Sequence, residues 1–461
     1  MAEIDPRVNG TEMEWAVMAN DTSTNQVTMI GSGVLNAYIK SYAKTMLGYD
    51  RTPCQYLQNG ARMYVDVGDH LEYATPETTR FTEAVAAEIA GERVVQDCLS
   101  TNLTEKSGGS RYQSLRQHKR VADRDGNTSG YHENYQASEA KVPIEPSKLL
   151  LVAAHVATRQ ILFGAGFLSM KGDFHLSQKA TTIRKAFSSG TMSEKPIIVL
   201  RHEGLADKEW SRVQVVGGDP NMSPWAMQMK LATTRIVLRL QEHDIDVPGV
   251  DLISPVQAMR QVNDSLGQGK FELSDGSVTN AVSVQRQFIE AGKSLAAEGL
   301  LEDQEMDALE EWERAIADFR QDPELLYDRA DWALRYKMLC AQRQKHGCAW
   351  DSVKLRDIDL TWDVIGKGGI AEKLRQSIWA KYMPDEHLIE RLKQQAPEKT
   401  RAHARSRFLQ AFGGSDKSIS VGWDEVGVEN TRIPLPDPRQ SHYPRLENMI
   451  RTHPESRQVA A

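Results

Sequence analysis

The sequence predicts an α+β fold, in which an antiparallel sheet is covered by helices and a small β-containing module follows near the C-terminus. Three observations support this prediction. Residues 11–15 and 62–66 alternate polar and apolar side chains with the period of two that is typical of half-buried strands. Residues 79–100 and most of 280–345 have the apolar spacing of helices. Strand-forming residues return between 418 and 433.

Length and composition limit the classes of protein to which the chain can belong. With 461 residues, of which 40% are apolar and 26% charged, it is predicted to be a globular protein with one large domain and a smaller appendage. The net charge of −7 argues against a general nucleic-acid binder. The cysteines form no C-x-x-C pair, so neither a zinc ribbon nor a disulfide framework is expected. The chain has no apolar leader and no run of roughly 18 apolar residues, so we expect a cytoplasmic protein with no membrane partner.

The segment 62–66 carries the first candidate site residues. As a strand it places Arg62, Tyr64 and Asp66 on one face, and the apolar residues between them face the core. A cation, a phenol and a carboxylate in one row suit a charged ligand. An antiparallel strand with one solvated face has the same pattern, so both interpretations stay open at this point.

A second alternating segment, 11–15, places Glu12 and Glu14 on one face with Met13 and Trp15 on the other. Two carboxylates on one strand face repel each other unless a cation lies between them. Mg²⁺ is the expected cation, because it binds hard oxygen ligands and shares them with phosphate. The alternative is a pair of solvated glutamates near the start of the chain.

The remaining elements follow from periodicity and capping residues. In chain order the sequence predicts a strand at 10–17, helices at 33–46, 79–100 and 147–163, an apolar run at 196–201, a strand at 213–216, a helix at 224–241 that Ser223 caps, and helices through 280–345.

Short motifs are distributed over almost the whole chain, and together they are far more specific than any one of them. They are Gly10–Glu14, Asn59–Arg62, Tyr64–Thr75, Gly130–Tyr135, Leu176–Gln178, Gly218–Ser223 and Thr400–Ala402. On these residues the chain resembles the Pup ligase and Pup deamidase family, proteasome accessory factors that are related to glutamine synthetase and other carboxylate–amine ligases.

The resemblance implies a glutamine synthetase-like catalytic domain over residues 1–403 and a small C-terminal domain, 404–461, that contributes to the nucleotide site. It also implies the cofactors ATP and Mg²⁺. By matching motif positions it implies metal contacts from Glu12, Tyr64 and Glu72, ATP contacts from Arg62, Thr75 and Trp423, and a catalytic carboxylate at Asp66.

The implied partners are Pup, a small ubiquitin-like modifier, and target proteins that carry lysines. The family's ligases join the C-terminal glutamate of Pup to a target lysine through an acyl phosphate, and its hydrolases deamidate Pup or remove it from targets. The hydrolase branch has a long insertion before the aspartate strand and reads Asp-His-Ala-His where this chain has Asp66-Val-Gly-Asp. The compact connection and the Val-Gly pair favour the ligase branch.

Alternatives are a Pup deamidase or depupylase, a carboxylate–amine ligase with another substrate, and a catalytically weakened protein that binds Pup. Departures from the family pattern affect the outer metal sites and phosphate contacts that the resemblance implies, and they suggest a divergent member whose modifier or target differs from standard Pup. They lie at Arg120, Val121, Val199, Leu200, Leu205 and Gln214.

Overall fold

The computed structural model describes residues 4–21, 26–39, 54–102, 112–122, 128–201, 208–413 and 417–452. The chain forms two compact units, each built from segments that are distant in the sequence. Unit 1 comprises residues 1–6, 120–203 and 208–383, and unit 2 comprises residues 7–119, 204–207 and 384–461. Among the described residues, no helix is both long enough and apolar enough to cross a membrane.

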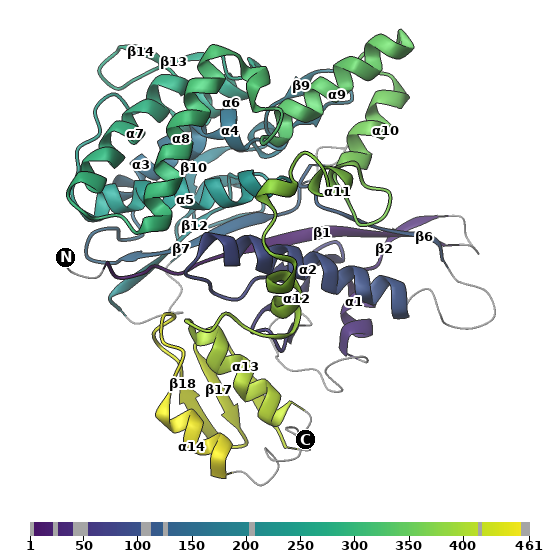
Figure 1. Ribbon diagram of the computed structural model, residues 1–461, viewed down its shortest axis with the longest axis vertical. Helices are drawn as coiled ribbons and strands as arrows, with labels where there is room; N and C mark the ends of the chain where they lie inside the picture. Colours follow the sequence, from purple (N-terminus) through teal and green to yellow (C-terminus); the bar gives the residue numbers. More distant parts are fainter. Residues whose placement is uncertain are drawn as a thin grey trace. The chain divides into compact units, whose positions relative to one another are not determined.

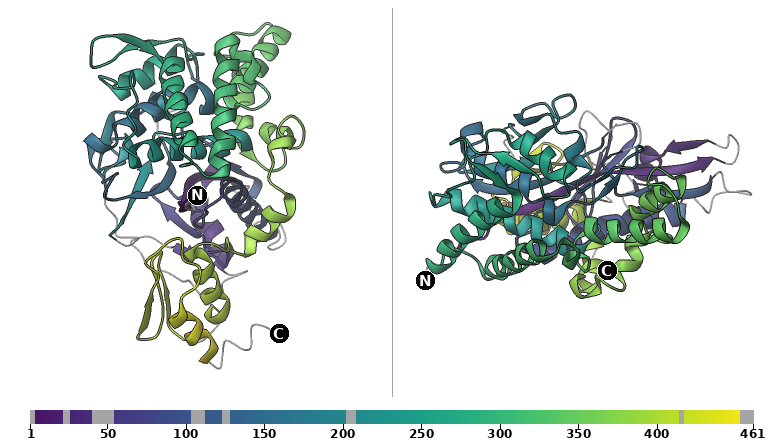
Figure 2. Two further views of the ribbon diagram at one scale, coloured as in Figure 1. Left: turned by 60° about the vertical axis from the view of Figure 1, so that its left-hand side comes forward. Right: turned by 90° about the horizontal axis from the view of Figure 1, so that it is seen from above.

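The strands of unit 2 are arranged around β1 (Asn9–Asp21). On one side β1 pairs with β5 (His70–Ala74), which pairs with β4 (Arg62–Asp66) and then β3 (Cys54–Tyr56), and all these pairs are antiparallel. The later part of β1 pairs with β2 (Val27–Met29) and β6 (Tyr112–His118), and Figure 2 shows β1 and β2 side by side. The strand predicted at 10–17 extends to Asp21 because the alternation of buried and half-buried residues continues that far.

The core face of this sheet is apolar, as the alternation predicts. Met13, Trp15, Met63 and Tyr73 are all buried on it. Helix α2 (Phe81–Asn102) packs against β1, and its Gly91 lies directly against the Tyr73 ring. The helix predicted at 79–100 is therefore confirmed with a shift of two residues at each end. The helix predicted at 33–46 is present as α1 (Gly31–Tyr38), and its predicted end lies outside the described residues.

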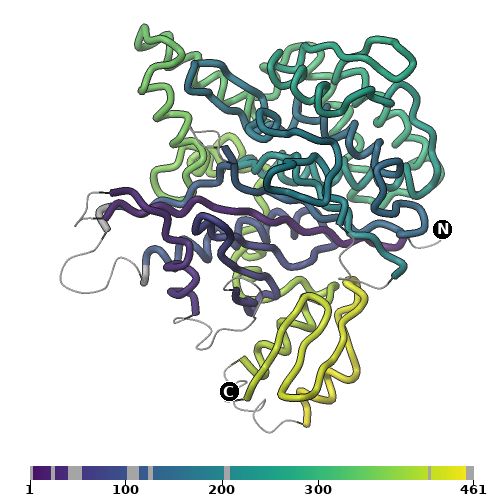
Figure 3. The backbone as a smooth tube through the Cα atoms, turned by 180° about the vertical axis from the view of Figure 1, so that it is seen from behind, coloured from purple at the N-terminus to yellow at the C-terminus, as the bar shows by residue number. Residues whose placement is uncertain are grey.

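The C-terminal part of unit 2 combines strands and helices (Figure 3). The strands predicted there are present, and two helices flank them. The apolar core of this part includes Phe408, Val426 and Leu446, and it also contains Tyr56 from β3. A domain boundary at residue 404 stays a prediction. The elements are α13 (Arg401–Phe412), β16 (Ile419–Val421), β17 (Glu425–Val428), β18 (Thr431–Pro434) and α14 (Pro444–Thr452). Helix α12 (Glu386–Gln394) precedes them and packs against α2.

The strands of unit 1 pair in the order β10 (Lys185–Ser188), β11 (Pro196–Val199), β12 (Trp210–Val215) and β7 (Tyr131–Ser138). The β10–β11 pair is parallel, whereas the others are antiparallel. Helix α3 (Leu150–Thr158) contacts β11, and α5 (Pro224–Glu242) contacts β7. The helix predicted at 147–163 is divided into α3 and α4 (Gln160–Phe163). Ser223 caps α5 by accepting a hydrogen bond from Ala226 N, as predicted.

Unit 1 contains further helices, and those between residues 281 and 346 account for the predicted helical stretch 280–345. Figure 1 shows α7 and α8 beside α5. These helices are α6 (Pro255–Asp264), α7 (Ala281–Ala297), α8 (Asp303–Gln321), α9 (Asp331–His346), α10 (Val353–Trp362) and α11 (Ile370–Arg375). Short strands complete unit 1: β8 (Phe167–Leu168), β9 (Phe174–His175), β13 (Lys270–Glu272), β14 (Val278–Asn280) and β15 (Val364–Ile365).

The contact between α2 and Tyr73 gives a testable prediction about two glycines in helices. A methyl group at Gly91 would lie 2.4 Å from the Tyr73 ring, whereas one at Gly33 would meet nothing closer than 3.9 Å. Alanine favours a helix over glycine by about 1 kcal/mol. Gly33→Ala should therefore stabilise the protein by about 0.5–1 kcal/mol, and Gly91→Ala should destabilise it by about 1–3 kcal/mol through overpacking. Thermal unfolding measures both, and a stabilised Gly91→Ala protein would contradict the packing described here.

Candidate functional site

The polar face of the unit 2 sheet gathers most of the predicted site residues. The strand register sets Glu14 opposite Glu72 and Glu72 opposite Tyr64, so these three side chains form one row across β1, β5 and β4. In the neighbouring row, Ala74 lies opposite both Glu12 and Arg62. The Arg62 guanidinium lies over the Tyr64 ring, 4.8 Å from its centroid. The faces predicted from the alternation are therefore confirmed.

Three carboxylates converge within these rows. Oxygens of Glu14, Asp66 and Glu72 all lie within 4.8 Å of one another. Glu72 is only 3% exposed, while the other two are half-buried, so the cluster is open on one side. A set of hard oxygen donors with one accessible side fits Mg²⁺, which keeps positions free for phosphate and water.

The electrostatics of this cluster favour a bound cation. Burial raises the pKa of Glu72 well above its ordinary value, and the charges of Glu14 and Glu12 raise it further. Burial and the neighbouring Glu72 also raise the pKa of Tyr64, so Tyr64 is a neutral phenol that donates a hydrogen bond to Glu72. The repulsion among these acids disfavours their ionised forms. A divalent cation bound among them would favour the ionised carboxylates instead and would lower their pKa values.

Asp66 ends β4, and the turn after it is fixed in two ways. The Asp66 carboxylate accepts a hydrogen bond of 2.8 Å from Val67 N. Later in the same turn, the Asp69 carboxylate accepts a hydrogen bond of 2.8 Å from Ser32 N at the start of α1. Gly68 and Asp69 both have positive φ, at 83° and 62°, which gives the tight turn between β4 and β5. The Val-Gly pair that distinguishes this chain therefore lies in a turn that α1 holds in place.

The structure also locates the residues that the resemblance assigns to ATP. Trp423 meets Tyr56 of β3 edge-on, with ring centroids 5.6 Å apart, and the Arg62 guanidinium lies 5.7 Å from the same Tyr56 ring. Trp423 and Arg62 are thus neighbours of one tyrosine. Thr75 directly follows β5, and its hydroxyl accepts a hydrogen bond of 3.0 Å from Thr11 N.

The motifs at Asn59–Arg62 and Thr400–Ala402 meet at a largely buried ion-pair cluster. Glu77 accepts hydrogen bonds from Arg401 Nε at 2.7 Å and from Arg405 Nη1 at 3.0 Å. Burial alone would raise the pKa of Glu77, but Arg405 and Arg401 outweigh it and lower the value to about 2. Gly60 has φ +77° and would clash with the Ala402 carbonyl oxygen if it carried a side chain. These motifs therefore hold the fold together around the site.

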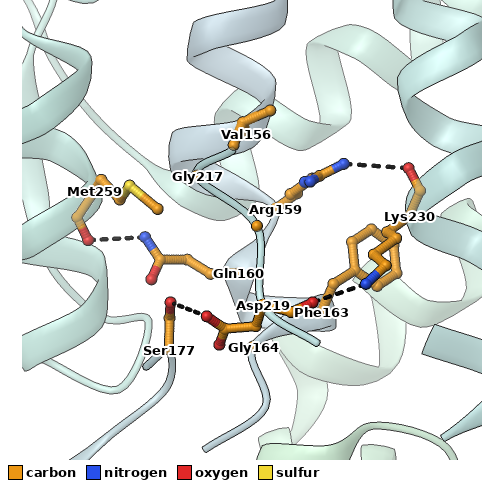
Figure 4. A pocket seen from close by; sticks show the side chains of 11 residues that line it. Val156, Arg159, Gln160, Phe163, Gly164, Ser177, Gly217, Asp219, Lys230 and Met259 are labelled. Carbon is orange, nitrogen blue, oxygen red and sulfur yellow. Dashed lines mark hydrogen bonds between the residues drawn. The ribbon is translucent and has the colours of Figure 1, made fainter. Parts of the chain in front are cut away.

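The motifs of unit 1 build another buried network. The Arg159 guanidinium forms an ion pair with Glu133, with Nη2 and Oε1 2.5 Å apart. The Asp219 carboxylate accepts hydrogen bonds from the backbone of residues 165, 178 and 179, and Lys230 donates to the Asp219 carbonyl at 2.7 Å. Figure 4 shows Arg159, Asp219 and Lys230 around a cavity of about 10 Å³. That space suits roughly one water molecule, so this cavity is no nucleotide pocket.

The departures from the family pattern mostly lie in packed surroundings of unit 1. Arg120 forms ion pairs with Asp359 and Asp363, at 3.0 and 2.7 Å, and Arg335 also binds both aspartates. Arg120 therefore belongs to a mostly buried cluster of two arginines and two aspartates. Val121, Val199 and Gln214 are buried, Leu200 is half-buried, and Leu205 lies outside the described residues.

Comparison with known proteins identifies the family. A family model described as Pup-ligase protein matches residues 7–427. The chain belongs to the Pup-ligase family. Among its relatives, the Pup–protein ligase of Kocuria rhizophila is 32% identical over 431 residues, which cover 88% of this chain and 91% of the relative. The Pup–protein ligase of a Nocardioides species is 28% identical over 460 residues, covering 97% and 99% of the two chains.

Solved structures of Pup ligases have the same fold. The structure of the complex between Pup and its ligase PafA matches with a TM-score of 0.82 and 23% identity, over 97% of this chain and 92% of the other. The structure of PafA in complex with ADP matches with a TM-score of 0.76 and 25% identity, over 87% and 90%. The predicted fold class and the family resemblance are thereby confirmed.

Relative to the prediction for this Pup-ligase family member, the geometry adds one acid. The resemblance assigns Glu12, Tyr64 and Glu72 to the metal, and carboxylate oxygens of Glu12 and Glu72 do lie within 4.8 Å of each other. Glu14 and Asp66 also supply oxygens that cluster with Glu72, and Glu14 is the acid that the resemblance did not assign. Glu14 shares the strand face of Glu12, so alternation had marked it as a candidate. Its position opposite Glu72 depends on the register, which the sequence of β1 alone does not contain.

Glu77 gives a prediction about acid stability. Its folded pKa of about 2 lies below its ordinary value of 4.5. The stabilisation is therefore complete above about pH 4.5 and is lost as pH falls toward 2, and it amounts to roughly 3 kcal/mol. Glu77→Gln should lower the Tm at neutral pH, and the gap from wild type should narrow below pH 4.5.

The control for this measurement is Glu398→Gln, because the Glu398 side chain is 74% exposed and is paired with Arg391. It should leave the Tm nearly unchanged at every pH. A gap between Glu77→Gln and wild type that stays constant from pH 7 to pH 3 would contradict the assigned pKa.

Proposed function

We propose that this protein is an ATP-dependent Pup–protein ligase, which joins the C-terminal glutamate side chain of a Pup-like modifier to target lysines. The observation that carries the proposal is the convergence of Glu14, Asp66 and Glu72 on the sheet face that also bears Arg62. Membership in the family and the relatives named Pup–protein ligase support it. We place the reaction in the cytoplasm, where ATP and target proteins are available.

The metal and nucleotide roles follow from this arrangement. Glu12, Tyr64 and Glu72 would contact Mg²⁺ together with Glu14, and Tyr64 would also orient Glu72 through their hydrogen bond. Mg²⁺, when bound, supplies positive charge that neutralises the phosphates of ATP. Arg62, Thr75 and Trp423 would contact ATP. The proposal for Trp423 rests on its contact with Tyr56, next to Arg62.

Asp66 would act in the second half of the reaction. A Pup glutamate oxygen attacks the γ-phosphorus of ATP, ADP leaves, and an acyl phosphate results. The lysine nitrogen then attacks the acyl carbon, phosphate leaves, and an isopeptide bond forms. The Asp66 carboxylate would hold the incoming ammonium and accept its proton as the nitrogen becomes acidic during attack. Its hydrogen bond from Val67 N fixes the orientation of the carboxylate for this step.

The deciding experiment is conjugation of a Pup protein with a C-terminal glutamate, followed by gel shift and mass spectrometry. Wild type should form conjugates only with ATP. Asp66→Asn should lower kcat by about 10²-fold or more, while ADP still binds within about threefold of wild type. Release of free Pup from a purified conjugate, without formation of new conjugate, would instead identify a hydrolase. Stimulation of ATP hydrolysis by a small acid, with no binding of Pup, would identify a different carboxylate–amine ligase.

Glu14, which the strand register places opposite Glu72 in the proposed metal site, gives a separate prediction. Glu14→Gln keeps the size of the side chain but removes one anionic oxygen from the cluster. The Mg²⁺ concentration for half-maximal conjugation should therefore rise by about tenfold or more. Glu425→Gln is the control, because Glu425 is half-exposed on β17 and contacts Arg432. An unchanged Mg²⁺ requirement for Glu14→Gln would exclude Glu14 from the metal site.

A further inference from the structure

Arg405 of helix α13 lies where the segments that carry the proposed nucleotide contacts come together. Its side chain is fully buried. It donates hydrogen bonds of 2.9 Å to the Gly60 carbonyl and 2.9 Å to the Trp423 carbonyl, and it binds Glu77 with both terminal nitrogens. Its guanidinium also lies over the Trp423 ring, 4.7 Å from the centroid. One side chain of α13 thus contacts three separate segments of the chain, at Gly60, Glu77 and Trp423.

Each of these segments carries one proposed ATP contact. Gly60 leads into β4, which begins at Arg62. Glu77 follows Thr75, two residues beyond it along the chain. Trp423 is itself the third contact, and Arg405 holds both its carbonyl and its ring. A planar guanidinium can serve several acceptors at once in fixed directions, whereas a lysine ammonium cannot stack in the same way.

We propose that Arg405, held by Glu77, is a positioning residue for the nucleotide site, because it fixes Trp423 relative to the strand of Arg62 and the segment of Thr75. This inference rests on the proposed function, because it assumes that Arg62, Thr75 and Trp423 contact ATP. The Tyr56 ring, which meets both Arg62 and Trp423, completes the connection on the side of the sheet. Arg405 acts through Trp423 and its neighbours and does not itself touch the nucleotide.

The local backbone is built for this arrangement. Gly60 has φ +77° and would place a side chain 2.8 Å from the Ala402 carbonyl oxygen, so the turn before β4 presses against the first turn of α13. The Thr400 hydroxyl donates to the Glu77 carbonyl at 2.9 Å, and Arg401 binds the Glu77 carboxylate. The backbone carbonyl and the side-chain carboxylate of Glu77 are therefore both held by residues at the start of α13. A change at Arg405 would thus alter the position of Trp423 more than that of α13.

The test compares nucleotide binding in Arg405→Lys and Arg335→Lys. Arg335 is an equally buried arginine that binds two aspartates in unit 1. Replacing it also removes a buried guanidinium group, but it leaves the contacts of Arg405 with Glu77 and Trp423 unchanged. The Kd for ADP, measured by titration calorimetry, should rise about tenfold or more in Arg405→Lys and stay within about twofold in Arg335→Lys. The tryptophan fluorescence change on ADP binding should shrink only in Arg405→Lys.

In conjugation assays, Arg405→Lys should raise the KM for ATP while the KM for Pup stays near the wild-type value. If Arg405→Lys does not fold, Glu77→Gln provides the second variant, because it keeps one acceptor oxygen, and it should raise the Kd for ADP about threefold or more. A folded variant of either kind that binds ADP like wild type would overturn the inference. Because ADP binding is measured without Pup, it tests the inference even if wild type conjugates no Pup and the proposed function fails.

Discussion

Repulsion among carboxylates on one sheet face is the constraint on which the site depends. Glu14 and Glu72 lie opposite each other across β1 and β5, where their charges oppose pairing. The opposite face holds the register, because Trp15 and Tyr73 stack there with centroids 5.7 Å apart. A slip of one residue would move this apolar set to the polar face. The packing that stabilises the sheet therefore keeps the acids together. A cation that binds between them relieves their repulsion, so the repulsion favours cation binding.

Local patterns predicted much of this arrangement. The period-two alternation placed Arg62, Tyr64 and Asp66 on one face, and the structure confirms it. The proline after Ser223 predicted the start of α5, because both residues act within one turn of the helix. Periodicity together with the family resemblance predicted the fold class, which comparison with solved Pup-ligase structures confirmed. The assigned roles of the site residues remain predictions.

What the sequence did not predict depends on contacts between distant segments. The register that sets Glu14 opposite Glu72 joins strands that are far apart in the chain, and no local pattern determines it. The parallel pairing of β10 with β11 also escaped prediction. Arg405 was overlooked because a single arginine in a helix is typical of a solvated surface, whereas here it is fully buried against Glu77.

Glu72 and Glu77 are near each other in the sequence and are both largely shielded from solvent, yet their neighbours give them opposite properties. Arg405 and Arg401 lower the pKa of Glu77, so its charge is balanced within the protein, and the residue is suited to holding structure. Burial and the acids Glu14 and Glu12 raise the pKa of Glu72. A buried acid among other acids is suited to a ligand that brings positive charge. Because burial is common to both residues, their neighbours separate the structural glutamate from the one that serves the proposed metal site.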